Sequence, residues 1–150
     1  MTLAQLSTTL DIIDQAGDQN ISLTGLHYDS RQVHPGFLFI AIKGYQTDGH
    51  LFINDALNRG AVAVIVEQEV FLPPGVTWIR VCDSRKALAQ LAACFYGYPS
   101  SKLRLIAVTG TNGKTTTTYL VKAVLEAAGR ATGLLGTIGN RLGDRFLKAE

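Results

Sequence analysis

The sequence predicts an α/β fold in which strands and helices alternate along the chain. Two apolar runs of strand length, residues 37–42 and 61–66, lack any polar alternation, which is typical of strands covered on both faces. A segment with helical spacing, residues 51–59, lies between them and ends at Gly60, the residue type favoured just after a helix. This alternation favours a mainly parallel sheet.

Residues 1–98 contain most of the predicted elements. The first helix is expected where Leu3, Leu6 and Leu10 recur at helical spacing. Asp83 or Ser84 is a suitable N-cap for a later helix whose apolar residues extend to Phe95. In chain order, we expect a helix at 2–13, strands at 23–29 and 37–42, a helix at 51–59, strands at 61–66 and 77–81, and a helix from 84 to 95.

A domain boundary is predicted where Gly, Pro and Ser gather after that last helix, at residues 97–101. A second unit then follows as a strand at 103–108, a glycine loop, a helix at 114–128 and a strand at 131–136. The expected domains are residues 1–98 and 99–150. A strand–helix–strand unit leaves sheet faces and edges uncovered, so we expect the chain to be part of a longer protein, or else to have a partner that covers them.

Composition excludes several classes of function. The chain has 150 residues, 47% of them hydrophobic, and a net charge of +2, which is too small to indicate a nucleic-acid or membrane-surface protein. Cys82 and Cys94 form no Cys-x-x-Cys motif. No signal peptide and no apolar stretch of about 20 residues is present, so we expect a cytoplasmic protein without membrane insertion.

The glycine loop is the main candidate for chemistry. Its glycines let the backbone approach phosphate oxygens, and the positive end of the following helix faces the anion. Lys114 can reach the β- and γ-phosphates, and the Thr115 hydroxyl can ligate Mg²⁺. The predicted ATP-binding residues are Gly110, Thr111, Asn112, Gly113, Lys114, Thr115 and Thr116.

The loop is a shortened form of the usual P-loop pattern, because Val108 occupies the position of its first glycine. The alternative is a merely structural glycine turn. The loop does not name a reaction either: no guanine-reading Asn-Lys-x-Asp occurs, while kinases and ligases both remain open.

Several motifs occur in order along the chain: Tyr28-Asp29-Ser30-Arg31, residues 35–41, Lys43-Gly44, Asp48-Gly49-His50, Gly60-Ala61 and, within the glycine loop, Thr111-Asn112. Together they resemble the Mur ligase superfamily of ATP-dependent amide-forming enzymes. Phe37 departs from the family pattern, which usually has Asp there. Two members share the pattern. Residues 95–100 and 136–139 favour the member that adds the third peptide residue over the one that adds D-Ala-D-Ala.

The resemblance implies that residues 1–98 form a small α/β uridine-nucleotide-binding domain. Ser30 would bond the uridine diphosphate and Tyr28 would flank the uracil, while Tyr45, Gln46 and Thr47 would line the same pocket. From the residues alone, 29–31 is interpreted first as a turn with a local ion pair, and 45–47 as an ordinary polar loop; the resemblance reverses the preference for 29–31.

The resemblance also implies a reaction. Residues 99–150 would begin a P-loop parallel-sheet ATPase domain, with Lys114 catalytic and with ATP and Mg²⁺ as cofactors. The enzyme would add the third amino acid to UDP-MurNAc-L-Ala-D-Glu through an acyl phosphate, so its partners would be that UDP-MurNAc-dipeptide and a free amino acid. The 150 residues alone are expected to be inactive, because the amino-acid domain is missing.

Three alternatives to that enzyme stay open at this point. The chain could belong to the D-Ala-D-Ala-adding Mur ligase, or be a non-catalytic UDP-sugar-binding module or a different P-loop phosphotransferase. The added amino acid, diaminopimelate or lysine, and the oligomeric state are not determined by the sequence.

Overall fold

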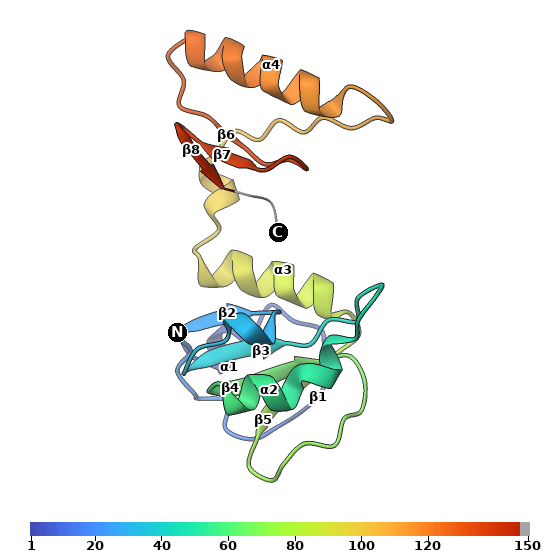
Figure 1. Ribbon diagram of the computed structural model, residues 1–150. Helices are drawn as coiled ribbons and strands as arrows, with labels where there is room; N and C mark the ends of the chain where they lie inside the picture. The colour runs from blue at the N-terminus through green and yellow to red at the C-terminus, as the bar shows by residue number, and fades with distance from the viewer. Residues whose placement is uncertain (148–150) are drawn as a thin grey trace. The chain divides into compact units, whose positions relative to one another are not determined.

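A computed structural model describes residues 1–147, which fall into two compact units (Figure 1). The first unit is Met1–Leu103 and the second begins at Arg104. The dividing point lies five residues beyond the boundary expected after Tyr98. The functional assignment of the two units stays a prediction, and each unit is described by itself below.

A five-stranded sheet forms the centre of the first unit. Its spatial order is β1-β5-β4-β3-β2. Strands β2 to β5 run parallel to their neighbours, whereas β1 pairs antiparallel with β5 at one edge. This arrangement confirms the predicted α/β class with a mainly parallel sheet. The strands are β1 (Ile12–Ala16), β2 (Gly25–His27), β3 (Phe37–Ile40), β4 (Ala61–Val66) and β5 (Thr77–Val81).

Helices cover both faces of this sheet, which explains the continuous apolar runs. Along β3, Leu38 and Ile40 pack with α1 and α3, while Phe39 points to the opposite face and packs with α2. All three side chains are fully buried. The helices are α1 (Leu3–Ser7), α2 (Ile53–Asn58) and α3 (Ser84–Phe95), with short 3-10 turns η1 (Ser30–Gln32), η2 (Gly49–Phe52) and η3 (Pro99–Lys102).

The predicted helix at 2–13 is wrong in its second half. Helix α1 ends at Ser7, where the hydroxyls of Thr8 and Thr9 donate back to the carbonyl oxygens of Gln5 and Leu6. Such side-chain bonds compete with continuation of the helix. The next segment forms edge strand β1 because β5 offers it an unpaired backbone edge, a partner more than sixty residues away.

The second unit contains helix α4 (Lys114–Ala127) and a three-stranded sheet of order β6-β7-β8. Its strands are β6 (Gly133–Leu134), β7 (Asn140–Leu142) and β8 (Arg145–Leu147), and they pair antiparallel. The predicted strand at 131–136 is thus reduced to two residues. The parallel pairing expected for this unit does not occur among its described strands.

The predicted strand at 103–108 is also wrong for the residues described here. The segment makes no strand pairing in the structure of residues 1–147, and Leu105 and Ile106 are 71% and 61% exposed. A strand needs a neighbour for its backbone hydrogen bonds and a covered face for its side chains. Neither is supplied within 1–147, so the glycine loop follows an exposed extended segment rather than a buried strand.

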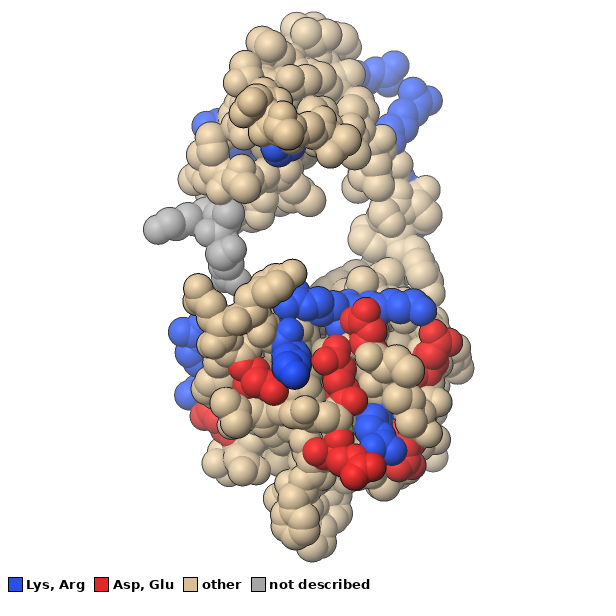
Figure 2. Space-filling view, turned by 90° about the vertical axis from the view of Figure 1, so that its right-hand side faces the viewer, with Lys and Arg blue, Asp and Glu red and all other residues tan. Residues whose placement is uncertain are grey.

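The described surface of the first unit carries charges of both signs. Lys and Arg side chains lie close to Asp and Glu side chains on the face drawn in Figure 2. This mixture agrees with the small net charge. Among residues 1–147, no helix combines the length and apolar character needed to cross a membrane.

Candidate functional site

The carboxyl ends of strands β2 to β5 meet at one edge of the sheet, because these strands are parallel. This is the edge where open α/β sheets place their ligands. The residues that follow the strands there are named the sheet-edge site. It comprises Tyr28, Asp29 and Ser30 after β2, the loop 43–48 after β3, Glu67 after β4, and Ser84 and Arg85 after β5.

Tyr28 and Asp29 begin the turn after β2. The half-exposed Tyr28 ring stacks on His27 with ring centroids 5.2 Å apart. Asp29 caps η1 and binds Arg31 through two contacts, Nε to Oδ1 at 2.9 Å and Nη2 to Oδ2 at 2.7 Å. The turn therefore does contain the local ion pair that its sequence suggested, and it presents the tyrosine ring beside that pair.

The Asp29–Arg31 pair is expected to make stability depend on pH in acid. The hydrogen bond from the Arg31 side chain lowers the pKa of Asp29 to about 2. A carboxylate with a depressed pKa stabilises the fold above its unfolded pKa of about 4, and the contribution disappears as pH falls toward 2. Urea unfolding of Asp29→Asn at pH 5 and pH 2.5 should show a smaller loss of stability on acidification than the wild type. An identical loss in both proteins would contradict this account.

Ser30 differs from its neighbours because it is buried, with 5% of its surface exposed. Its side chain interacts with the carboxylate of Asp55 on α2, and this interaction is the first cause that lowers the pKa of Asp55. The turn after β2 is thus connected to α2 through Ser30.

The loop 43–48 projects its predicted ligand-binding residues into solvent. Tyr45, Gln46 and Thr47 are all exposed, and the loop is closed by a backbone bond from Gly44 N to Thr47 O of 3.0 Å. Arg85 holds the start of the loop. Its Nη2 donates to the Lys43 carbonyl at 3.2 Å, and its guanidinium carbon lies 5.6 Å from the centroid of the Tyr45 ring.

Sequence reasoning missed Glu67, Ser84 and Arg85 as part of this edge. The Glu67 carboxylate accepts from the Ser84 amide at 2.6 Å and from its hydroxyl at 3.0 Å, next to the N-cap Asp83. The helix start at 83–84 was predictable from its capping residues. Its partner Glu67 lies 17 residues earlier, just after β4, and no local sequence pattern indicates that contact.

The glycine loop of the second unit presents an open helix N-terminus. Gly110 and Gly113 have φ of +144° and +77°, backbone conformations that glycine adopts without strain. Among the described residues, no side chain caps the first turn of α4, and that turn contains no acidic residue. Its amide groups are thus directed at the loop as anion donors.

Lys114 bends back over this loop. Its Nζ donates to the carbonyl oxygen of Gly110 and, at 3.3 Å, to that of Thr111. The residue is exposed rather than buried, while Thr115 is half-buried one position along α4. Lys114, Thr115 and the helix amides fit a nucleotide phosphate with its Mg²⁺, because they combine a cation, a hydroxyl ligand and unpaired N–H donors.

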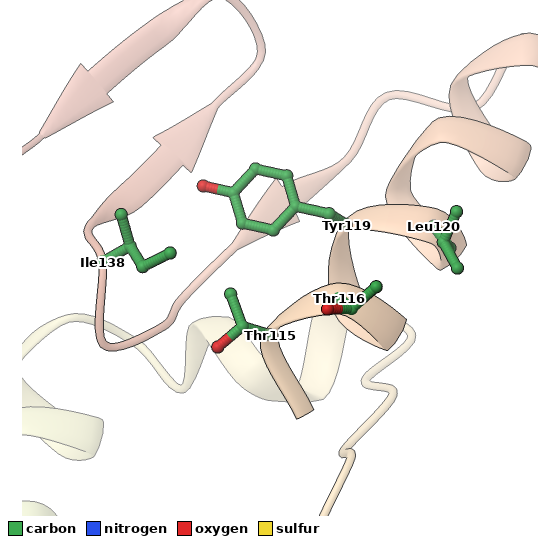
Figure 3. Close-up of a pocket in the computed structure, with 5 residues that line it drawn as sticks. All are labelled: Thr115, Thr116, Tyr119, Leu120 and Ile138. Atoms are coloured by element: carbon green, nitrogen blue, oxygen red, sulfur yellow. The ribbon is translucent and has the colours of Figure 1, made fainter. Parts of the chain in front are cut away.

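A shallow, mostly apolar hollow of about 420 Å³ adjoins the first turns of α4 (Figure 3). The rings and methyl groups around it come from the helix and from the loop before β7. Thr115 lies at its border, next to the glycine loop. The lining residues are Thr115, Thr116, Tyr119, Leu120 and Ile138.

Two family models match this chain. The model described as "Mur ligase family, catalytic domain" matches residues 22–96, which is half of the chain. The model described as "Mur ligase middle domain" matches residues 108–149. The two matches fall on the two compact units in turn.

Similar curated proteins share the whole chain but are much longer. The UDP-N-acetylmuramoyl-L-alanyl-D-glutamate--2,6-diaminopimelate ligase of Alkaliphilus metalliredigens is 47% identical over 150 residues, all of this chain and 30% of that protein. The protein of the same name from Geobacter sulfurreducens is 48% identical over 149 residues, 99% of this chain and 29% of its own length. The chain thus spans about a third of the length of these relatives.

Solved structures agree with this similarity. A structure titled UDP-N-acetylmuramoyl-L-alanyl-D-glutamate--2,6-diaminopimelate ligase has a TM-score of 0.73 and 28% identity, over 98% of this chain and 30% of the other. MurF ligase from Thermotoga maritima in complex with ADP has a TM-score of 0.52 and 32% identity, over 71% of this chain and 24% of the other.

Proposed function

The chain belongs to the Mur ligase family, and from this premise we propose that its whole protein adds the third amino acid to UDP-MurNAc-L-Ala-D-Glu in peptidoglycan precursor synthesis. The observation that carries the proposal is the lysine-bearing glycine loop before an uncapped helix, in a chain 47% identical throughout to a ligase of that name. The names of the relatives favour 2,6-diaminopimelate as the added amino acid. An ATP requirement favours the cytoplasm as its location.

In this proposal the second unit binds the phosphates of ATP. Lys114 exchanges its bonds to the Gly110 and Thr111 carbonyls for bonds to phosphate oxygens, and the N-terminal amides of α4 bind the same anion. Thr115 would supply a hydroxyl ligand for Mg²⁺, and the bound ion would neutralise charge on the phosphates. Residues 99–150 are accordingly proposed to begin the ATP-binding domain.

The proposed reaction has two displacements. The D-glutamyl carboxylate attacks the γ-phosphorus of ATP, the bond to the β-phosphate oxygen breaks, and ADP leaves. The amine of the incoming amino acid then attacks the acyl carbon, loses a proton and expels phosphate, which completes the amide. Lys114 and the loop amides contribute by positioning the transferring phosphoryl group and stabilising its charge.

The first unit, residues 1–98, is proposed to bind the UDP end of the substrate at the sheet-edge site. An exposed Tyr28 ring and the projecting loop with Tyr45, Gln46 and Thr47 supply aromatic and polar surface at the carboxyl ends of two adjacent strands. The Ser30 oxygen lies at the base of the same turn. Base stacking on such rings and hydrogen bonding to exposed polar groups suit a uridine nucleotide.

Replacing Tyr28 by alanine tests this assignment. Loss of stacking on a base typically costs about 1–3 kcal/mol, so the variant should bind UDP about 5- to 150-fold more weakly than the wild type. Isothermal titration calorimetry with UDP measures the effect. Tyr96→Ala is the matched control, since Tyr96 is an exposed tyrosine outside the sheet-edge site, and it should bind UDP like the wild type. Equal affinity of all three proteins for UDP would show that Tyr28 does not contribute to UDP binding.

The main competing function is a non-catalytic UDP-sugar-binding module. Titration of the 150-residue chain with UDP and, separately, with Mg-ATP distinguishes the two. Binding of both ligands supports the ligase, binding of UDP alone supports the module, and binding of Mg-ATP alone indicates a different phosphotransferase. A D-Ala-D-Ala-adding ligase is less favoured, because relatives 41–50% identical to this chain carry the name of the diaminopimelate-adding ligase. The solved structure of that name also has a TM-score of 0.73, against 0.61 for the structure titled D-alanyl-D-alanyl ligase.

A further inference from the structure

His50 is a buried histidine at the base of an exposed loop. Only 4% of its side chain is exposed, although Tyr45, Gln46 and Thr47 just before it are all in solvent. The ring uses both of its nitrogens. Nδ1 lies 2.6 Å from Asp48 Oδ1, and Nε2 lies 3.0 Å from the backbone nitrogen of Glu67.

These two contacts define the hydrogen positions on the ring. The Glu67 backbone N–H can only donate, so Nε2 of His50 accepts this bond and carries no hydrogen. The ring hydrogen is therefore on Nδ1, which donates to the Asp48 carboxylate. The backbone N–H of His50 also donates to Asp48, and together these bonds lower the pKa of that carboxyl, the backbone bond most.

The same residues join three strand ends. Asp48 closes the loop after β3, where it forms an isolated bridge with Lys43. Glu67 follows β4, and its carboxylate holds the start of α3 through Ser84, which is fully buried. His50 connects Asp48, in the loop after β3, with Glu67, after β4. The loop is thus fastened at its base to a rigid part of the sheet, while its tip has few contacts of its own.

We propose that His50 is a positioning residue for nucleotide binding: it fixes the loop 43–48 to the end of β4, so that Tyr45, Gln46 and Thr47 are held ready for the ligand. The inference rests on the proposed binding of UDP at the sheet-edge site. A loop held in its bound conformation loses less conformational freedom on binding, and this raises affinity without any direct contact to the ligand.

Three substitutions test separately the two hydrogen bonds of the His50 ring, to Asp48 and to the Glu67 amide. His50→Asn keeps a donor near the Nδ1 position for Asp48, His50→Gln keeps an acceptor near the Nε2 position for the Glu67 amide, and His50→Phe fills the space but keeps neither. Each lost bond of about 1 kcal/mol corresponds to roughly fivefold in an equilibrium constant. His50→Phe should therefore bind UDP at least about tenfold more weakly, with Asn and Gln between it and the wild type.

Global destabilisation is controlled with Leu6→Ala. Leu6 is fully buried on α1, outside the sheet-edge site, so this variant loses thermal stability without touching the loop. Calorimetry with UDP at a temperature where all variants are folded should show near wild-type affinity for Leu6→Ala. If the affinity for UDP instead falls in step with the melting temperature across the His50 variants and Leu6→Ala, His50 has only a structural role and the proposal is overturned.

Amide hydrogen exchange gives a readout that does not depend on UDP. The Gly44 amide is bonded to Thr47 O within this loop, and the Gly49 amide is bonded to Ile42 O at the base of the loop. Both amides should exchange faster in His50→Phe than in the wild type or in Leu6→Ala. Unchanged protection overturns the inference. A wild type that fails to bind UDP refutes the proposed function, while faster exchange in His50→Phe would still support His50 as the residue that fixes the loop.

Discussion

Lys114→Ala is expected to reduce ATP-dependent ligation by the full-length protein about 100-fold or more. In the structure Nζ lies over the loop carbonyls of Gly110 and Thr111, where it can turn to phosphate oxygens. Loss of one preorganised group that stabilises charge in the transition state typically lowers kcat by about 10²–10³. Release of phosphate in the presence of the UDP-dipeptide and diaminopimelate measures the effect.

A matched control for Lys114 is Lys102→Ala. Lys102 is an exposed lysine in η3 of the first unit, so its loss removes the same charge outside the glycine loop. The control should retain wild-type turnover. Because Lys114 is exposed and bonded only within its own loop region, Lys114→Ala should keep its melting temperature close to that of the wild type. Undiminished ligation by a folded Lys114→Ala protein would exclude the proposed role.

Phe39→Ala is expected to lower the free energy of unfolding of the first unit by about 3–5 kcal/mol, the usual cost of removing a buried phenylalanine. Phe39 is fully buried between β3 and α2. A typical domain has only about 5–15 kcal/mol of stability, so this change removes a large part of it. Urea unfolding followed by tryptophan emission reports on this unit alone, because the single tryptophan, Trp78, lies on β5.

The control for Phe39 is the same substitution at an exposed site. Phe71 is 102% exposed, in the segment between β4 and β5, and Phe71→Ala should change the free energy of unfolding by no more than about 0.5 kcal/mol. Similar losses in the two variants would mean that the assigned core is incorrect. A large loss for Phe39→Ala without any change for Phe71→Ala would support a first unit with a core of its own.

The sequence determined the main elements of the first unit because their signals are local. The strands predicted at 61–66 and 77–81 coincide with β4 and β5, and the capping residues Asp83 and Ser84 coincide with the start of α3. The glycines and Lys114 likewise predicted the loop before α4. In each case the chemistry that defines the element is contained within a few adjacent residues.

Tertiary structure decided what depends on distant partners. The segment 12–16 became an edge strand because β5 supplies an open edge, and 103–108 formed no strand because no neighbour pairs with it within residues 1–147. The contact between Ser30 and Asp55 on α2 joins residues 25 positions apart in the sequence. The bond from the Glu67 amide to His50 joins the loop after β3 to the end of β4, across 17 positions of sequence. Hydrogen bonds and burial depend on which groups meet in space, and a sequence pattern of a few residues carries no information about such meetings.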